Sequence, residues 1–261
     1  MDPASHRRHW PAPPALSPWL ARSWHWSIPA GGRLPSLYPG TGAELIGNLG
    51  CPVEIRVCGP DGESMTRRWL TGETLLLAPR RSQMHFQSRG PVHWVGARLR
   101  SGALFPLLGH PLTLVGDTPC SLADLGLPAL EEGRLRAGGV TALLDWLMGR
   151  AAPLPLLAQG VERLYYGATL TTLQQDLAMS ERSLQRHLRP YLGISTRQFL
   201  HIARFQRALR LLHQSGQSLE SAHQAGFCDQ SHFIKSCRRF TGLSPGCWLA
   251  SEPAGFSHYG E

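Results

Sequence analysis

The hydrophobic pattern of the chain changes from strand-like to helical between about residues 121 and 155, and this change limits the fold more than any other feature of the sequence. From about residue 26 to residue 100, short apolar runs alternate with Gly and Pro, which is typical of an antiparallel β-sandwich or barrel. The clearest runs are Val53–Val57, Thr74–Ala78 and Val92–Leu99. Residues 121–150 show helical spacing, and after the segment 151–155 (AAPLP) every apolar pattern is helical. We therefore expect two domains, a β-rich domain over 1–152 and an all-α domain over 153–261.

The sequence also argues against a membrane or secreted protein. No run approaches the roughly 18 apolar residues of a membrane span. The N-terminal segment MDPASHRRHWPAPPALSPWL has basic residues but no apolar core behind them, unlike a secretory signal. The six cysteines form no Cys-x-x-Cys pair, so we expect reduced thiols that fill the core. These features predict a cytoplasmic chain with no membrane partner.

Basic side chains are concentrated in one part of the chain. The formal net charge is +8, and residues 180–240 hold ten basic and three acidic side chains, a local charge of +7. A basic excess confined to one segment is expected of a surface that binds a polyanion such as nucleic acid. The alternative is a solvated, arginine-rich surface, because 25 of the 26 basic residues are Arg.

Residues 170–192 contain two short helices separated by a break at Ala178-Met179. The apolar edge of the first helix consists of Leu170, Leu173 and Leu177. Ser180 is an N-cap residue type, since its hydroxyl can accept an unpaired backbone N–H of the first turn. The second helix is expected to run from Glu181 until Pro190 disfavours it. Two short helices joined by a tight turn form a helix-turn-helix.

The second of these helices separates apolar from polar side chains. Leu184 and Leu188 share its buried side. The opposite side carries side chains that can bond bases or phosphates, namely Arg182, Gln185, Arg186 and Arg189. In the major groove, Arg bonds guanine and Gln bonds adenine in a bidentate manner.

A longer amphipathic helix over residues 196–213 follows. Its apolar stripe is Phe199, Ile202, Phe205, Leu209 and Leu212, and its other faces carry Arg197, Arg204, Arg207 and Arg210. A weak short helix is expected around Leu219–Ala225, then a turn at Gly226-Phe227 and a helix over Gln230–Phe240 with Asp229 as its N-cap. Phe233, Cys237 and Phe240 share one face of this last helix, and His232, Lys235, Ser236 and Arg239 share another.

Four segments, SERSLQRHL, ARFQRALRLL, GFCDQSHF and RRFTGLSP, occur in this order over about residues 160–250. In sequence and spacing they resemble the DNA-binding domain of AraC-type transcriptional regulators. The resemblance implies a seven-helix domain with two helix-turn-helix units joined by a long helix. It also implies a sequence-specific regulator that binds double-stranded DNA, is not an enzyme and needs no cofactor. RNA polymerase, a small-molecule effector and a second copy of the chain are its other candidate partners.

The resemblance assigns roles to residues by position. The implied base-reading residues are Arg182, Gln185, Arg186, Gln230, Ser231, His232 and Lys235. The expected phosphate contacts are Arg189, Arg197, Arg204, Arg238 and Arg239. The chain departs from the family pattern at Gln174 and Ala178, and in GQSLESAHQAGF, where Ser218, Ser221 and Ala225 stand in place of branched apolar residues. We therefore expect the second unit to be either less stable or differently registered.

The N-terminal segments WPAPPALSPWLARSWHW and VHWVGARLRSGALFPLLGHPLTLVGDTPCSLADL resemble the cupin-like sensor domain of some short AraC-type regulators. The implied fold is a small β-barrel followed by helices, able to hold a ligand or to pair with a second subunit. Candidate pocket residues are Trp24, Trp26, Trp69, Phe86 and Trp94, with ordinary core as the alternative. Arg98 and Arg100 sit at strand spacing, where they face either an anionic ligand or solvent.

Enzyme and metal patterns are weak. The chain has no His-x-His pair, and His85 and His93 are separated by a turn, so no metal site is expected. Residues 242–246 (GLSPG) formally match a nucleophile elbow, but a basic helix precedes them and Pro follows the Ser. The alternative function is a ligand-binding or enzymatic barrel with a helical protein-interaction domain. The two functions predict different arrangements of five basic residues, Arg182, Arg186, Arg204, Lys235 and Arg239. DNA binding predicts that they lie on one surface, and the alternative function predicts that they are scattered.

Overall fold

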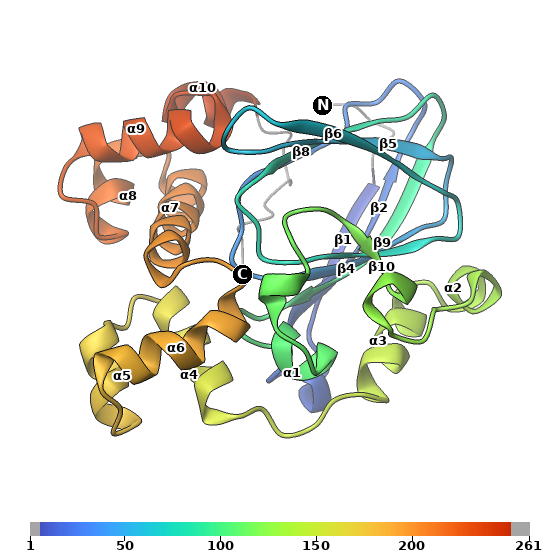
Figure 1. The fold of residues 1–261 in the computed structure, drawn as a ribbon. Helices are drawn as coiled ribbons and strands as arrows, with labels where there is room; N and C mark the ends of the chain where they lie inside the picture. The colour runs from blue at the N-terminus through green and yellow to red at the C-terminus, as the bar shows by residue number, and fades with distance from the viewer. Residues whose placement is uncertain (1–5, 252–261) are drawn as a thin grey trace.

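The computed structural model describes residues 6–251, in which a β-barrel lies beside a helical domain (Figure 1). The strands are β1 (His6–Pro11), β2 (Leu20–Ile28), β3 (Ser36–Leu37), β4 (Glu44–Asn48), β5 (Val53–Cys58), β6 (Ser64–Trp69), β7 (Thr74–Leu77), β8 (Gln83–Gln87), β9 (Val92–Leu99) and β10 (Cys120–Ser121). Antiparallel pairing gives a six-stranded sheet of order β1-β2-β9-β4-β7-β10 and a four-stranded sheet of order β3-β8-β5-β6. The expected β-rich domain is confirmed, and β9 has the expected bounds. The ends of the two expected domains, residues 1–5 and 252–261, lie outside the described residues.

Large aromatic side chains fill the space between the two sheets. Trp24 and Trp26 lie two residues apart on β2, so they project from the same face, and their rings stack with centroids 4.0 Å apart. Gly96 on the neighbouring strand makes room for them, because a Cβ at this position would lie 2.1 Å from the Trp24 indole. The barrel interior is therefore closely packed around these indoles.

The six-stranded sheet is covered on both faces, which explains why β4 is buried along its whole length. Its outer face packs on α1 (Leu104–Leu108), α2 (Glu132–Gly138) and α3 (Val140–Met148), with the short 3-10 helices η1 (Pro14–Leu16), η2 (Leu112–Leu114) and η3 (Ala123–Leu125) nearby. Glu44 and Arg98 form a buried ion pair within this sheet at 3.0 Å. Arg98 is therefore part of the sheet and does not form an open site for an anion.

Residues 156–251 form seven helices, as the resemblance implied. They are α4 (Leu156–Tyr165), α5 (Leu170–Asp176), α6 (Glu181–Leu192), α7 (Thr196–Ser215), α8 (Ser218–Gln224), α9 (Gln230–Thr241) and α10 (Pro245–Ser251). Helices α5 and α6 are the first helix-turn-helix unit, α8 and α9 are the second, and α7 joins them (Figure 1).

The expected end of α6 at Pro190 is wrong, because the helix continues to Leu192. Pro190 lies in the last turn, where its missing N–H removes a single helical hydrogen bond. Tyr191 and Leu192 are buried and hold this turn against the domain core. Gly193, with φ of 68°, then ends the helix in the left-handed conformation that favours glycine.

The barrel contacts both helix-turn-helix units. At the first unit, Arg100 forms an ion pair with Glu162 of α4 at 2.6 Å, and the rings of Phe105 and Tyr191 lie 4.4 Å apart. At the second unit, Tyr38 of the barrel is part of the apolar cluster formed by α7 to α10. Arg100 thus joins the two domains, and the expectation of a free anion-binding face there is wrong.

The structure bears on two further expectations. Within residues 6–251, no helix combines the length and the hydropathy needed to cross a membrane. The six cysteines are free thiols, but only Cys237 is buried, while Cys228 and Cys247 are exposed and the other three are half-buried. The expectation that the cysteines fill the core therefore holds for Cys237 alone.

Candidate nucleic-acid interface

Helix α6 is built as a recognition helix of a helix-turn-helix unit. The Ser180 hydroxyl accepts the backbone N–H of Ser183 at 3.3 Å, which confirms the expected N-cap. Ala178 in the preceding turn adopts φ of 51°, a conformation that costs a non-glycine residue free energy. Leu184 and Leu188 are buried. The opposite, exposed side carries Arg182, Gln185, Arg186 and Arg189, as expected.

One of these side chains is engaged within the helix. The Gln185 amide donates a hydrogen bond to the carboxylate of Glu181 at 3.0 Å. Both residues are exposed, so this bond competes with water and contributes little to stability. Gln185 can therefore exchange the carboxylate for a base edge at low cost.

Helix α9 repeats this construction. The Asp229 carboxylate accepts the backbone N–H of His232 at 2.8 Å, which confirms the expected N-cap. This hydrogen bond lowers the pKa of Asp229 below its ordinary value. The expected DNA contacts on this helix lie at the surface: Gln230 is half-buried, and Ser231, His232, Lys235, Arg238 and Arg239 are exposed.

Ser236 does not share the exposed face, contrary to expectation. It is buried and hydrogen-bonded to the His201 ring of α7 at 2.9 Å. The same imidazole lies 5.0 Å from the Phe240 ring. Ser236 therefore fixes α9 against the long helix.

Three arginines surround His201. Burial lowers the pKa of its imidazole, and the positive charges of Arg239, Arg204 and Arg197 lower it further. Side chains from α7 and α9 therefore place positive charges around one point of the surface. Such a potential attracts the phosphates of a nucleic acid.

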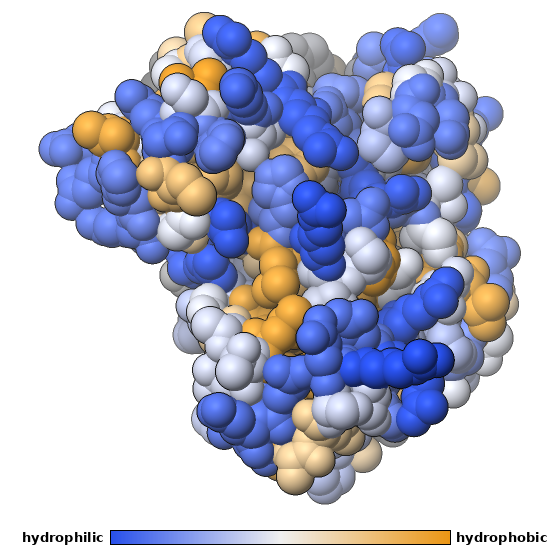
Figure 2. Space-filling view, turned by 60° about the vertical axis from the view of Figure 1, so that its left-hand side comes forward, coloured by the Kyte–Doolittle hydropathy of each residue, from blue (hydrophilic) through white to orange (hydrophobic). Residues whose placement is uncertain are grey.

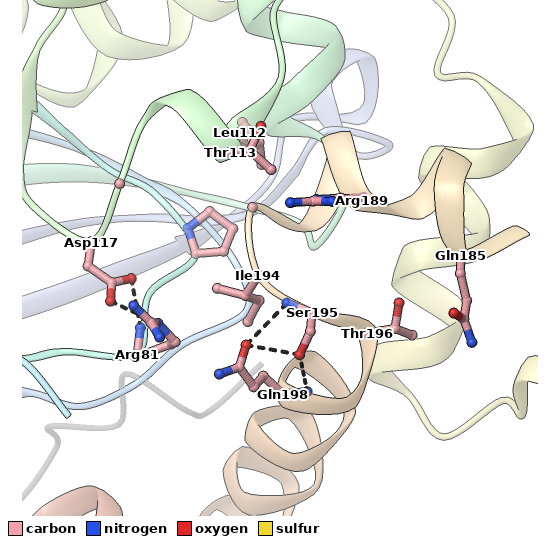
Figure 3. Close-up of a pocket in the computed structure, with 13 residues that line it drawn as sticks. Arg81, Leu112, Thr113, Asp117, Gln185, Arg189, Ile194, Ser195, Thr196 and Gln198 are labelled. Carbon is pink, nitrogen blue, oxygen red and sulfur yellow. Dashed lines mark hydrogen bonds and ion pairs between the residues drawn. The ribbon is translucent and has the colours of Figure 1, made fainter. Parts of the chain in front are cut away.

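A cavity of about 590 Å³ lies at the α6 end of this surface (Figure 3). It is bordered by Gln185 and Arg189 of α6, by Gln198 of α7 and by Arg81 and Asp117 of the barrel. Figure 3 shows Arg189 on one side of the cavity and the Arg81–Asp117 ion pair, 3.2 Å long, on the other. The barrel thus borders the candidate DNA-binding face.

Two smaller cavities continue the surface toward α9. One, of about 200 Å³, shares Arg81 and Gln198 with the first cavity and is also bordered by His201 and Arg239. The other, of about 260 Å³, shares His201 and Arg239 and adds cations of both helices, Arg204 and Lys235. On the helical side of the molecule, Figure 2 shows a mostly hydrophilic surface with a hollow between its upper and lower parts. Through these shared residues the three cavities form one surface, which includes Arg189 of α6, Arg204 of α7, and Lys235 and Arg239 of α9.

Arg207 is not part of this surface, contrary to the expectation for α7. Its guanidinium is half-buried and donates hydrogen bonds to the backbone carbonyls of Tyr165 and Ala225, the latter at 3.2 Å. These carbonyls end α4 and α8. Arg207 therefore joins the end of α4 to the end of α8, and these hydrogen bonds occupy its guanidinium.

The candidate pocket residues of the barrel lie in its core. They pack against one another, with ring centroids 5.4 Å apart for Trp69 and Trp94 and 5.2 Å apart for Phe86 and Trp94. Phe86 also borders a surface cavity of about 1100 Å³, together with polar residues that include Arg68 and Arg89. The packing supports the core alternative for the tryptophans.

The two histidines weighed as metal ligands each have another partner. His85 is hydrogen-bonded to Ser36, and His93 to Ser27, both at 3.0 Å. Among residues 6–251, no three His, Cys, Asp or Glu side chains are grouped as metal ligands. Gly242 ends α9 in the left-handed conformation and α10 begins at Pro245, so this segment joins two helices and is not a strand-to-helix elbow.

Comparisons with known proteins agree with this geometry. Residues 173–251 match a family model described as a helix-turn-helix domain. No curated protein sequence matches the chain. Among solved structures, the chain resembles the apo form of a single-site variant of ToxT from Vibrio cholerae, with a TM-score of 0.51, 12% identity and coverage of 87% of this chain and 97% of that one. Another ToxT structure gives a TM-score of 0.49 at 9% identity, covering 95% and 98%. The cupin domain of Schizosaccharomyces pombe Cnp3 gives 0.25 at 14% identity, covering 38% and 55%.

At such low identity the structural likeness establishes a shared two-domain fold and nothing more. The matched helices and the N-caps of α6 and α9 define the class, a helix-turn-helix domain with two such units. In this chain a β-rich N-terminal domain precedes the matched helix-turn-helix domain.

Proposed function

We propose that the chain reads double-stranded DNA through α6 and α9, which enter successive segments of the major groove. The observation that carries this proposal is the single basic surface along α6, α7 and α9. In the base-reading role we place Arg182, Gln185, Arg186, Gln230, Ser231, His232 and Lys235. On phosphates we place Arg189, Arg197, Arg204, Arg238 and Arg239. All of these residues are exposed except Arg204 and Gln230, which are half-buried, and this exposure supports the roles, since a base or phosphate must reach each side chain.

We further propose that the N-terminal domain modulates DNA binding through a small-molecule effector or through a second copy of the chain. Its contacts with α4, α6 and α7 support this role, because a change in the barrel reaches both helix-turn-helix units. The domain boundary is proposed at 152/153, in the segment between α3 and α4. Contact with RNA polymerase and a cytoplasmic location complete the proposal, since both follow from regulating transcription at DNA.

The proposal is tested by the salt dependence of DNA binding. The full chain is titrated with a mixed-sequence duplex at several salt concentrations. The logarithm of the association constant is expected to fall linearly with the logarithm of salt concentration, with a slope of about −0.9 for each phosphate contacted. No binding at low salt, or binding that does not depend on salt, would show that the basic surface does not bind DNA.

A further inference from the structure

The loop between β3 and β4 reaches from the barrel into the second helix-turn-helix unit. Tyr38 in this loop is 6% exposed. It belongs to the same apolar cluster as Phe205 of α7, Phe233 of α9 and Trp248 of α10. A side chain more than 150 residues away in the sequence thus completes the core of this unit.

The same loop is anchored to α7 by a buried polar contact. The backbone N–H and the hydroxyl of Thr41 both donate to the side-chain carbonyl of Gln206, at 3.2 and 2.8 Å. The Ser101 hydroxyl donates to the Thr41 hydroxyl oxygen at 3.2 Å. Thr41 and Gln206 are each 1% exposed. Because water cannot replace either partner, separating the loop from α7 leaves buried polar groups unpaired.

The second unit has little apolar core of its own beneath α8. This seven-residue helix buries Ser221 and Ala222, while Leu219 is 53% exposed. Its N-cap residue, Gln217, makes no side-chain capping bond. Few buried apolar contacts and a missing cap lower the free energy of local opening. Helix α8 therefore depends on packing supplied by other parts of the chain.

The first unit differs in this respect. Thr169 caps α5, and the cluster that includes Leu173, Leu184 and Leu188 lies under α5 and α6. Phe199 of α7 completes the same cluster. Loss of the barrel loop would therefore leave this core intact.

We propose that Tyr38 and Thr41 are positioning residues for DNA reading by the second unit. The barrel loop holds α7 and α9 in the arrangement that presents α9 to the major groove, while α6 is presented without it. A molecule that binds the barrel and displaces this loop would then weaken recognition of one half of the DNA site only. The inference rests on the proposed function, in which α6 and α9 each read one half of that site.

The test uses the full chain and a duplex selected by the wild-type chain from a random library. Footprints of Arg186→Ala and Lys235→Ala assign each half of the site to α6 or α9. Two further duplexes carry a scrambled first or second half. For each half, the discrimination ratio is the Kd of the scrambled duplex divided by the Kd of the intact one. Tyr38→Ala is expected to lower the ratio of the α9 half by about tenfold or more, because a large buried side chain is lost, and to leave the ratio of the α6 half unchanged.

Matched variants separate positioning from general instability. Thr41→Ser keeps both hydrogen-bond donors and should retain the wild-type ratios. Tyr38→Phe keeps the buried ring and should lower the ratio of the α9 half less than Tyr38→Ala does. Thr41→Val removes the hydroxyl that donates to Gln206 and accepts from Ser101, keeps the backbone donor, and should lower the ratio of the α9 half by a smaller factor. Thr41→Val tests the inference if Tyr38→Ala does not fold.

Two results would overturn the inference. One is an equal loss in both halves by a variant whose circular dichroism is that of the wild type. The other is no change in either ratio for both Tyr38→Ala and Thr41→Val. Failure of the wild-type chain to select any duplex would instead contradict the proposed function itself.

Discussion

The two helix-turn-helix units follow one plan and differ in the residues that hold them together. In each unit, the fourth residue after the N-cap of the first helix points into the core. This residue is Leu173 in α5 and Ser221 in α8. The C-cap residue is Leu177 in α5 and Ala225 in α8. The first unit is therefore held by its own leucines, whereas the second has small side chains at the same positions.

The second unit replaces these missing contacts with residues from outside its two helices. Arg207 donates to the carbonyl at the end of α8, and His201 is hydrogen-bonded to Ser236 of α9. Tyr38 adds a ring from the barrel. The comparison indicates that α6 is held in place by residues of its own unit. The position of α9 depends in addition on residues outside its unit.

The largest effect on stability is expected at the core position that differs between α5 and α8. This position is Leu173 in α5 and Ser221 in α8. Leu173→Ala should lower the free energy of unfolding by about 2–5 kcal/mol, since it removes a fully buried leucine from the core. Ser221→Ala removes one hydroxyl that donates to the carbonyl of Gln217 at 2.6 Å and should cost about 1 kcal/mol. Urea denaturation of both variants measures the difference. Equal losses would mean that the two units are equally well packed.

Removing the bridge between the units should have the next largest effect. Arg207→Met keeps an unbranched stem but leaves the carbonyls of Tyr165 and Ala225 without their guanidinium donor. The expected loss of stability is about 1.5–3 kcal/mol. The rate of amide hydrogen exchange should increase mainly over residues 217–226, because few other contacts hold this segment. Faster exchange confined to residues 181–189 would reverse the assignment of the weaker unit.

A base-reading residue and a phosphate-binding residue of the first unit should be distinguishable by their specificity. Arg186→Ala should weaken binding to the selected site by about 1–3 kcal/mol and relax the preference at one or two base pairs. Arg189→Ala should weaken specific and mixed-sequence duplexes alike. Both side chains are exposed on α6, so neither change should affect folding. If Arg186→Ala lowered both affinities equally, Arg186 would be a phosphate contact.

Acidification is expected to have the smallest effect on the stability of the chain. It should act through His201, where α7 contacts α9. The pKa of His201 is lowered in the folded chain by burial and by the arginines around it, so the unfolded chain binds the proton more readily. Stability should therefore decrease as the pH falls below the ordinary histidine pKa of 6.5. Burial also lowers the pKa values of His25 and His85, which contribute with the same sign. Thermal unfolding of His201→Gln between about pH 7 and pH 5 should show a smaller loss than the wild type. An identical pH dependence would exclude His201 as a contributor.

Much of the fold could be predicted from short-range patterns in the sequence. Gly and Pro punctuate the strands, as at Gly90-Pro91 before β9, and N-cap residues mark the starts of α6 and α9. The end of α6 was missed because the effect of Pro190 depends on the tertiary packing of the residues that follow it. Ser236 was misplaced for a similar reason, since a small polar residue suits both a surface and a buried hydrogen bond.

Contacts between the domains could not be predicted from one sequence. Thr41 and Gln206 are 165 residues apart, and no local pattern pairs them. A weak signal exists at Gln206, a polar residue next to the apolar stripe of α7, whose burial requires a partner. Arg81 was missed as a residue bordering the candidate interface because its position in the loop between β7 and β8 gives no indication of the neighbouring domain.

The central claim is that both α6 and α9 read DNA, and hydroxyl-radical footprinting of the full chain on its selected duplex tests this claim most directly. Two protected segments are expected, with centres about 10–10.5 base pairs apart, because recognition helices in successive major-groove segments lie one helical turn apart. Arg186→Ala should weaken protection of one segment and Lys235→Ala protection of the other. A single protected segment that is lost with Arg186→Ala and unaffected by Lys235→Ala would contradict the account, because α9 would then take no part in reading the site.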